Sequence, residues 1–159
     1  QVCDAVKIPV IAAGGIADGR QLAAAFMLGA VGVQVGTRFL VAKECTISPV
    51  YKEKILKAKD IDTISTGRRL GHPVRALKTP FTRELAHMEY DSNISDEELE
   101  QFGVGALRKA AREGDAQHGS FLAGQVAAMV HKEQTAKEII TELFEQGEQV
   151  LGGAMKWVK

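Results

Sequence analysis

The sequence has few of the features that would place it in several large classes of protein. Its 159 residues include only two cysteines, Cys3 and Cys45. Two are too few for a disulfide framework, and their spacing is not that of metal ligands. Twenty Lys and Arg residues balance twenty Asp and Glu residues, so nothing favours a nucleic acid or an anionic membrane as a partner. No apolar run reaches the roughly 18 residues of a membrane span. Two unpaired thiols suit a reducing compartment, so we expect a cytoplasmic protein that acts on small molecules or proteins.

The common arrangements of catalytic and metal-binding residues are also missing. No histidine has a second histidine four positions away or a cysteine in ligand spacing, so we expect no metal centre. The sequence contains neither a Gly-x-Ser-x-Gly nucleophile elbow nor a Walker motif. His72 lies in a turn-rich segment from which it could reach an active site, although a surface or packing role is the more frequent outcome.

Residues 8–39 contain two consecutive units of strand, glycine turn and helix. The first strand, residues 8–13, is apolar on both faces, which is typical of a parallel strand covered by helices. Asp18 and Gln21 have the spacing of a capping box, which predicts that a helix begins directly after Asp18. The second strand spans residues 31–35 and runs into another turn. Two such units in succession predict an α/β fold with adjacent parallel strands.

Both strands are followed by glycine: Gly14 and Gly15 follow the first, and Gly36 with Thr37 follows the second. Because the carboxyl ends of neighbouring parallel strands lie side by side, the turns bring backbone N–H groups and helix starts toward one point, which favours an anion. Glycine leaves the backbone accessible, and the Thr37 hydroxyl could donate a further hydrogen bond. Gln34 is a polar interruption of an apolar strand. One Gly-Gly pair would indicate only a tight turn, whereas the paired set favours a phosphate site.

The length is too short for a complete fold of this kind. A barrel of eight parallel strands needs roughly 250 residues, whereas this chain has 159. It begins at Gln1 without a methionine, only a few residues before a strand. We therefore expect the chain to be the carboxyl-terminal part of a longer protein and to be inactive alone.

After the phosphate unit the barrel pattern stops, and a smaller excursion of helices and a hairpin is expected. Ser48, followed by proline, predicts the start of a helix. Residues 60–65 and 74–78 favour strands and are separated by a turn-rich segment, which predicts an antiparallel hairpin. Ser95 begins a capping box, and residues 106–112 form a further predicted helix. Three arginines in or beside the hairpin either form a solvated surface or bind a cofactor or carrier phosphate; they are Arg68, Arg69 and Arg75.

Two further helices are expected to return to the barrel. Ser120 would cap an apolar helix over residues 121–130, and Thr135 would cap the last helix. Gly124 and Gln125 fall inside the first of these. A glycine in a helix interior costs about 1 kcal/mol relative to alanine, so either close helix packing or contact with a flat ligand would explain Gly124. The expected apolar face of the last helix consists of Ile139, Ile140, Leu143 and Phe144.

The segments AAGGIADG and GVQVGTRF resemble the FMN-dependent enoyl-[acyl-carrier-protein] reductase II and nitronate monooxygenase family. KEKILKAKDIDT, GHPVRALK and GSFLAGQVA extend the resemblance over nearly the whole chain and look closer to the enoyl reductase branch. The resemblance implies the carboxyl-terminal half of a TIM (β/α)8 barrel with a smaller helical and hairpin subdomain. Residues 1–45 would hold the last strands and phosphate loops, 46–118 the inserted subdomain, and 119–159 helices that pack back on the barrel.

The resemblance also implies a cofactor and a reaction. FMN would be bound by its phosphate at the two turns, with Gly124 and Gln125 beside the flavin ring. Hydride would pass from NADH or NADPH through FMN to the double bond of an enoyl thioester on acyl carrier protein. Nitronate oxidation is the alternative, and a non-flavin barrel that binds a sugar or nucleotide phosphate is the third. The family's catalytic histidine lies in the amino-terminal half, outside this chain, so we assign no catalytic residue within these 159 residues. A homodimer is compatible with the resemblance. The implied cofactor-binding residues are Gly14, Gly15, Gln34, Gly36, Thr37, Gly124 and Gln125.

Overall fold

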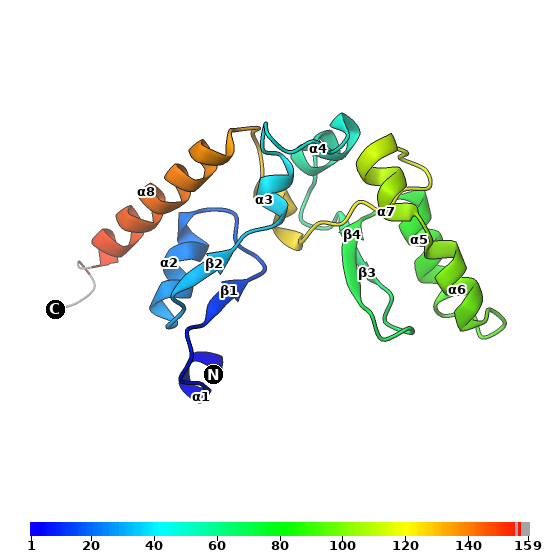
Figure 1. Cartoon of the computed structure of the whole chain (residues 1–159), viewed down its shortest axis with the longest axis horizontal. Coiled ribbons are helices and arrows are strands. Elements are labelled where there is room, and N and C mark those ends of the chain that lie inside the picture. Colours follow the sequence, from blue (N-terminus) through cyan, green and yellow to red (C-terminus); the bar gives the residue numbers. More distant parts are fainter. Residues whose placement is uncertain (155, 157–159) are drawn as a thin grey trace. The chain divides into compact units, whose positions relative to one another are not determined.

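The computed structural model describes residues 1–154 and 156, and the chain forms two compact units (Figure 1). The first unit consists of Gln1–Cys45 together with the segment from Lys132 onward, and the second consists of Thr46–His131. Residues 119–131, which we expected to pack back on the barrel together with the C-terminal helix, belong to the second unit.

The first unit is a βαβ unit with further helices. Strands β1 (Ile11–Ala13) and β2 (Gly32–Gln34) are parallel neighbours, which confirms the predicted pairing. Both strands are shorter than the apolar runs that predicted them, although the Val31 N–H also donates to the Val10 carbonyl at 2.8 Å. The helices of this unit are α1 (Val2–Ala5), α2 (Gly19–Met27), α3 (Thr37–Leu40) and α8 (Ala136–Ala154).

Helix α2 begins directly after Asp18, as the sequence indicated. The Asp18 side chain accepts the Arg20 N–H at 2.8 Å, and the Gln21 side chain accepts the Asp18 N–H at 2.9 Å, so the predicted capping box is confirmed. Gly29 follows the helix with φ of +95°. Leu22 of this helix is buried, whereas Met27 is 72% exposed.

Helix α8 packs against α2 along a narrower apolar stripe than expected. Leu143 and Ile139 are buried, whereas Ile140 and Phe144 are half-exposed, so the predicted four-residue face is only half correct. The crossing is close, because a Cβ placed on Gly147 would lie 2.5 Å from Leu22 Cδ2. Glycine at this position therefore permits the two helices to approach.

The second unit combines an antiparallel hairpin with helices. Strands β3 (Thr63–Thr66) and β4 (Val74–Leu77) pair antiparallel, as predicted. The Ser48 and Ser95 caps are also confirmed. Helix α5 was not predicted, although Thr79 and Pro80 are an ordinary cap and first residue. The α-helices are α4 (Pro49–Leu56), α5 (Pro80–Met88), α6 (Asp96–Gly103) and α7 (Ala106–Arg108), which continues as the π-helix η1 (Lys109–Glu113).

The predicted helix over residues 121–130 is wrong. Phe121 to Ala123 is extended and pairs with β4: the Leu77 N–H donates to the Phe121 carbonyl at 2.8 Å, and the Ala123 N–H donates to the Arg75 carbonyl at 3.1 Å. Only Gln125–Met129 is helical, as the 3₁₀-helix η2. Pairing with the hairpin and complete burial of Phe121 thus override the helical pattern of the local sequence.

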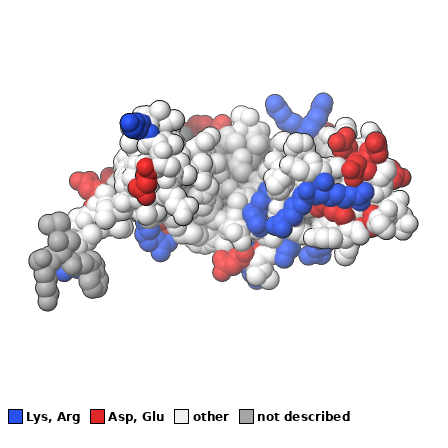
Figure 2. Space-filling model, turned by 90° about the horizontal axis from the view of Figure 1, so that it is seen from below, with Lys and Arg blue, Asp and Glu red and all other residues white. Residues whose placement is uncertain are grey.

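The basic segment around the hairpin has structural partners. Figure 2 shows a band of Lys and Arg side chains over the second unit, with Asp and Glu side chains close to it. The Arg69 guanidinium donates to the Asp91 and Ile94 carbonyls and forms an ion pair with Asp96 at 2.8 Å. Arg75 donates across the hairpin to the Thr63 hydroxyl at 3.1 Å. These two arginines therefore stabilise the hairpin and the loop beside it.

Candidate functional site

The two glycine turns follow the carboxyl ends of β1 and β2, which lie side by side at the same end of the strand pair. Ala13 and Gln34 are the last paired residues, so the chain turns away from both strands at neighbouring points. Gly14 and Gly15 have φ values of +89° and +70°, a conformation that residues with a side chain rarely adopt. The structure thus brings together five of the predicted site residues: Gly14, Gly15, Gln34, Gly36 and Thr37.

The backbone at both turns is open to a ligand. A Cβ built on Gly14, Gly15 or Gly36 would meet no heavy atom within 4 Å. Gln34 is exposed, and Thr37 is the first residue of α3, directly after the N-cap residue Gly36. Exposed backbone without side chains, next to a hydroxyl, fits a phosphate group, whose oxygens accept hydrogen bonds from N–H and O–H donors.

The start of α2 contributes less to this site than we expected. Asp18 accepts the Arg20 N–H, and the Gln146 side-chain oxygen accepts the Gly19 N–H at 3.1 Å. These protein groups occupy the first N–H donors of the helix. The candidate phosphate site therefore consists of the Gly14–Gly15 turn and the residues at the start of α3.

A buried arginine beside the second turn forms hydrogen bonds with the segment that precedes α8. Arg38 follows Thr37 and is only 6% exposed. Its guanidinium donates to the Lys132 carbonyl at 3.0 Å and to the side-chain carbonyl of Gln134. The start of α3 is thereby fixed against the segment that leads into α8.

The hydrogen bonds continue along α8 to the start of α2. Gln134 donates to one Glu142 oxygen at 2.6 Å, and Gln146 donates to the other at 3.0 Å. Lys132 forms an ion pair with Glu142 at 3.0 Å. Because Gln146 also accepts the Gly19 N–H, one chain of hydrogen bonds connects the helices that follow the two glycine turns.

The protonation states suit this network. The hydrogen bond from Gln134 is the main cause that lowers the pKa of Glu142, and Lys132 and Arg38 lower it further. Burial lowers the pKa of Arg38, and the charge of Glu142 opposes that effect. Both groups are therefore charged near neutral pH. The sequence analysis missed these residues; the available signal was the polar pair Glu142 and Gln146, four positions apart on an amphipathic helix.

The remaining two predicted site residues, Gly124 and Gln125, lie in the second unit. Gly124 precedes η2 with an extended backbone, and Gln125 is exposed at the first position of that 3₁₀-helix. They are not inside a long helix, so the argument from a glycine in a helix interior does not apply. The Tyr51 hydroxyl donates to the Leu122 carbonyl at 2.7 Å and fixes the segment that precedes them.

The described part of the chain contains neither a cluster of metal ligands nor a membrane-spanning helix. Residues 1–154 and 156 contain no group of three His, Cys, Asp or Glu side chains that could hold a metal ion. No helix in this part of the chain is long and apolar enough to cross a membrane.

The fold and the open turns define an α/β protein with a parallel βαβ unit suited to a phosphate group. The sequence profile of the nitronate monooxygenase family matches residues 1–146, and the chain belongs to this family.

Relatives of known sequence carry the same family name. A probable nitronate monooxygenase of Staphylococcus saprophyticus is 38% identical over 152 residues, which cover 95% of this chain and 42% of that protein. A probable nitronate monooxygenase of Staphylococcus aureus (strain MSSA476) is 34% identical over 152 residues, which again cover 95% of this chain and 42% of that protein.

Solved structures share the fold. FabK from Thermotoga maritima is 46% identical with a TM-score of 0.94, over 99% of this chain and 50% of that one. A nitroalkane oxidase from Streptomyces ansochromogenes is 30% identical with a TM-score of 0.77, over 96% of this chain and 43% of that one. The chain thus spans half or less of the length of the relatives that it matches.

Proposed function

We propose that this chain carries the FMN phosphate site of a flavin-dependent enoyl-[acyl-carrier-protein] reductase with a TIM-barrel fold. The observation that carries the proposal is the 46% identity to FabK, an enoyl-[acyl-carrier-protein] reductase II. The identity to the probable nitronate monooxygenase is 38%, and that to the nitroalkane oxidase is 30%.

In this proposal the two turns bind the phosphate of FMN. The backbone of Gly14, Gly15 and Gly36 approaches the phosphate oxygens, and the Thr37 hydroxyl donates to one of them. Gln34 projects from the last position of β2 beside the same turn. Bound FMN supplies the hydride chemistry, and these residues hold it by the phosphate and so orient it.

Further parts of the proposal concern the ring, the substrate and the partners. Gly124 and Gln125 lie beside the flavin ring. The electron donor is NADH or NADPH, and the substrate is an enoyl thioester carried on acyl carrier protein. No residue of this chain is assigned as a catalytic acid or base, and the whole protein forms a homodimer.

Nitronate monooxygenase is the second candidate. The family profile and the relatives from Staphylococcus favour it, because they carry that name. Flavin-dependent oxidation of an alkyl nitronate would use the same phosphate site, so the turns alone do not discriminate between the two reactions.

Two assays on the purified whole protein separate the candidates. We expect oxidation of NADH or NADPH that depends on an added trans-2-enoyl thioester, under anaerobic conditions, with a saturated thioester as product. Oxygen uptake with an alkyl nitronate, without turnover of the enoyl thioester, would establish the second candidate instead. A protein that binds no flavin and performs neither reaction would refute both.

A further inference from the structure

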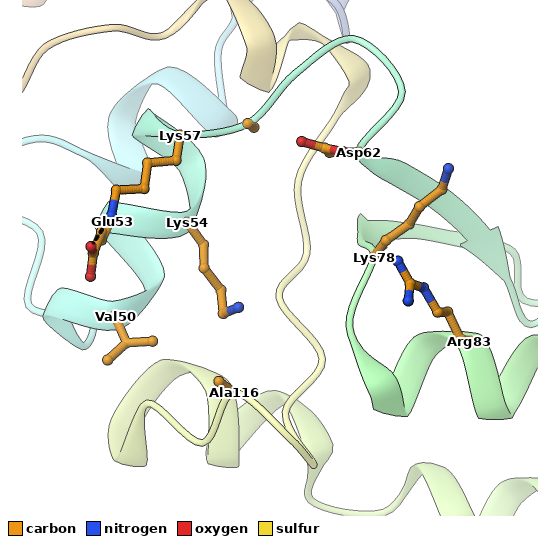
Figure 3. Close-up of a pocket in the computed structure, with 9 residues that line it drawn as sticks. Val50, Glu53, Lys54, Lys57, Asp62, Lys78, Arg83 and Ala116 are labelled. Atoms are coloured by element: carbon orange, nitrogen blue, oxygen red, sulfur yellow. Dashed lines mark hydrogen bonds and ion pairs between the residues drawn. The ribbon is translucent and has the colours of Figure 1, made fainter.

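The second unit has a surface hollow of about 450 Å³ between α4 and the junction of β4 with α5 (Figure 3). Helix α4 forms one side. Asp62, Lys78 and Arg83 line the other side, and Ala116 lies below them in the view. A volume of this size is within the range of small-molecule sites, roughly 300 to 1,000 Å³.

Basic side chains outnumber acidic ones around this hollow. Lys57 is paired with Glu53 one turn away on α4. Within the described part of the chain, Lys54, Lys78 and Arg83 form no ion pair with a carboxylate. Lys54 and Arg83 face the hollow from opposite sides and give it a positive potential, whereas the Lys78 ammonium points away from α4 (Figure 3). An anionic ligand between Lys54 and Arg83 would be attracted by both charges.

The Lys54 ammonium is held at the wall of the hollow. Its Nζ lies 5.3 Å from the centre of the Phe121 ring, within the range of a cation–π interaction. Phe121 is fully buried, and its ring meets that of Tyr51 edge-on at 4.9 Å. Figure 3 shows the side chain pointing from α4 toward Ala116. A fixed ring beneath the ammonium reduces the entropy that binding an anion there would cost.

The opposite side of the hollow offers the Arg83 guanidinium as a hydrogen-bond donor and the Asp62 carboxylate as an acceptor. The Arg83 guanidinium reaches the wall of the hollow from α5, and a guanidinium can bind two oxygens of a phosphate at once (Figure 3). The Asp62 carboxylate points into the hollow and is oriented by the Lys59 N–H, which donates to it at 2.8 Å. The Asp62 carboxylate, which has no ion-pair partner among the lining residues, disfavours a bare anion but accepts a hydrogen bond from a ligand hydroxyl.

We propose that this hollow is a second anion site, which binds a phosphate ester that also carries a hydroxyl group. Arg83 and Lys54 bind the phosphate, and Asp62 accepts the hydroxyl. Ribose phosphates, and therefore nucleotides, have this combination of groups. The proposal uses only residues of the second unit and does not rest on the FMN assignment.

Binding is tested by calorimetric titration of the whole protein saturated with FMN, so that a flavin phosphate site is already filled. The probes are ADP, inorganic pyrophosphate and adenosine. We expect ADP to bind most tightly, pyrophosphate at least tenfold more weakly, and adenosine not at all. ADP affinity should also fall steeply as salt rises from 50 to 200 mM. Pyrophosphate that binds as tightly as ADP would overturn the assignment of Asp62 and of a phosphate ester.

Three substitutions locate the site. Charge-assisted hydrogen bonds are each worth a factor of about 10 to 100 in affinity, so Arg83→Gln and Lys54→Gln should each weaken ADP by that factor. Lys109→Gln is the matched control, because it removes one positive charge from an exposed position of the second unit that does not line the hollow; it should leave the affinity within about twofold. Circular dichroism verifies that each variant is folded.

Two further outcomes would overturn the proposal. One is the absence of ADP binding by the wild-type protein at millimolar concentration. The other is ADP binding that Arg83→Gln and Lys54→Gln leave unchanged, since the nucleotide would then bind elsewhere. Neither outcome alters the assays of the proposed reductase, so failure of this site is distinguishable from failure of the proposed function.

Discussion

Gly147 allows α8 to pack closely against α2, although glycine is intrinsically unfavourable inside a helix. In an exposed helix interior, glycine to alanine stabilises by roughly 0.5 to 1 kcal/mol. At position 147 the added methyl group would meet Leu22 Cδ2 at 2.5 Å, and overpacking of this kind costs typically about 1 to 3 kcal/mol. We therefore expect Gly147→Ala to lower the free energy of unfolding by about 1 kcal/mol or more, measured by urea denaturation.

The same helix contains the control. Gly153 is also within α8, and a Cβ there would meet nothing within 4 Å. Gly153→Ala should therefore be neutral or slightly stabilising. If both substitutions had the same effect, the close approach of α2 and α8 would not be what requires glycine at position 147.

Asp115 makes the stability of the second unit depend on pH. The N–H and then the side chain of His118, followed by the Gln117 N–H, lower the pKa of Asp115 from 3.8 to about 2. A carboxyl group with a lowered pKa stabilises the fold above its unfolded value and loses that contribution as the pH falls through its folded value. We expect Asp115→Asn to lower the melting temperature at pH 6. The difference from wild type should shrink as the pH falls from 3.8 toward 2, and a difference that does not depend on pH would contradict this account.

At the scale of elements, the hydrogen bonds of α8 hold the starts of α2 and α3 together. Glu142→Leu removes the acceptor of Gln134 and Gln146 and the ion-pair partner of Lys132. Leaving such partly buried donors unpaired costs about 1 to 3 kcal/mol. We therefore expect a lower melting temperature and, because the start of α3 loosens, a weaker affinity of the whole protein for FMN. Both are measured by thermal unfolding with and without added FMN.

Glu145→Leu is the control for this prediction. Glu145 lies on the same helix and is exposed, and its side chain has no ion pair or hydrogen bond within the described residues. It should change neither quantity. An unchanged FMN affinity in a destabilised Glu142→Leu protein would show that the network supports the fold without positioning the turns.

The elements that the sequence predicted correctly are those stabilised by contacts between residues close together in the chain. Asp18, Ser48 and Ser95 cap helices through side chains within three residues of the first turn, so the pattern and the contact coincide. The glycine turns of the candidate site were predictable for the same reason. In contrast, residues 121–130 were misassigned because their conformation depends on pairing with β4, a strand more than 40 residues earlier. The Arg38 network was missed because the hydrogen-bond partners of Arg38 lie 94 and 96 positions away.

At the scale of the whole chain, the βαβ unit leaves apolar side chains in contact with solvent. Ile11 of β1 is 63% exposed, and Val31, just before β2, is 66% exposed. The β1–β2 sheet has only these two strands, so both of its outer edges are unpaired within the described residues. Unpaired edges and exposed apolar surface promote association. We expect the 159-residue chain, expressed alone, to form aggregates or be partly molten and to lack reductase activity.

Size-exclusion chromatography with light scattering, together with a thermal melt, checks this expectation. Association should decrease when Ile11 and Val31 are both replaced by threonine, because that change keeps the β-branched shape and lowers the apolar area. A monodisperse, cooperatively melting and active preparation of the unmodified chain would contradict it.

The measurement that tests the central claim most directly is the FMN affinity of Gly36→Asp in the whole protein. The position has open space around it and an ordinary negative φ, so the substitution should leave the fold intact. A carboxylate there would place negative charge and bulk where the phosphate binds. Loss of two charge-assisted hydrogen bonds, at about 1.5 to 3 kcal/mol each, weakens FMN by roughly two to four orders of magnitude.

The readout is the flavin absorbance of the purified proteins, with far-UV circular dichroism as the check on folding. Wild type should be yellow, Thr37→Ala should retain part of its FMN, and Gly36→Asp should be colourless while it keeps the wild-type spectrum in the far ultraviolet. A folded Gly36→Asp protein with a full complement of FMN would show that this turn does not bind the phosphate.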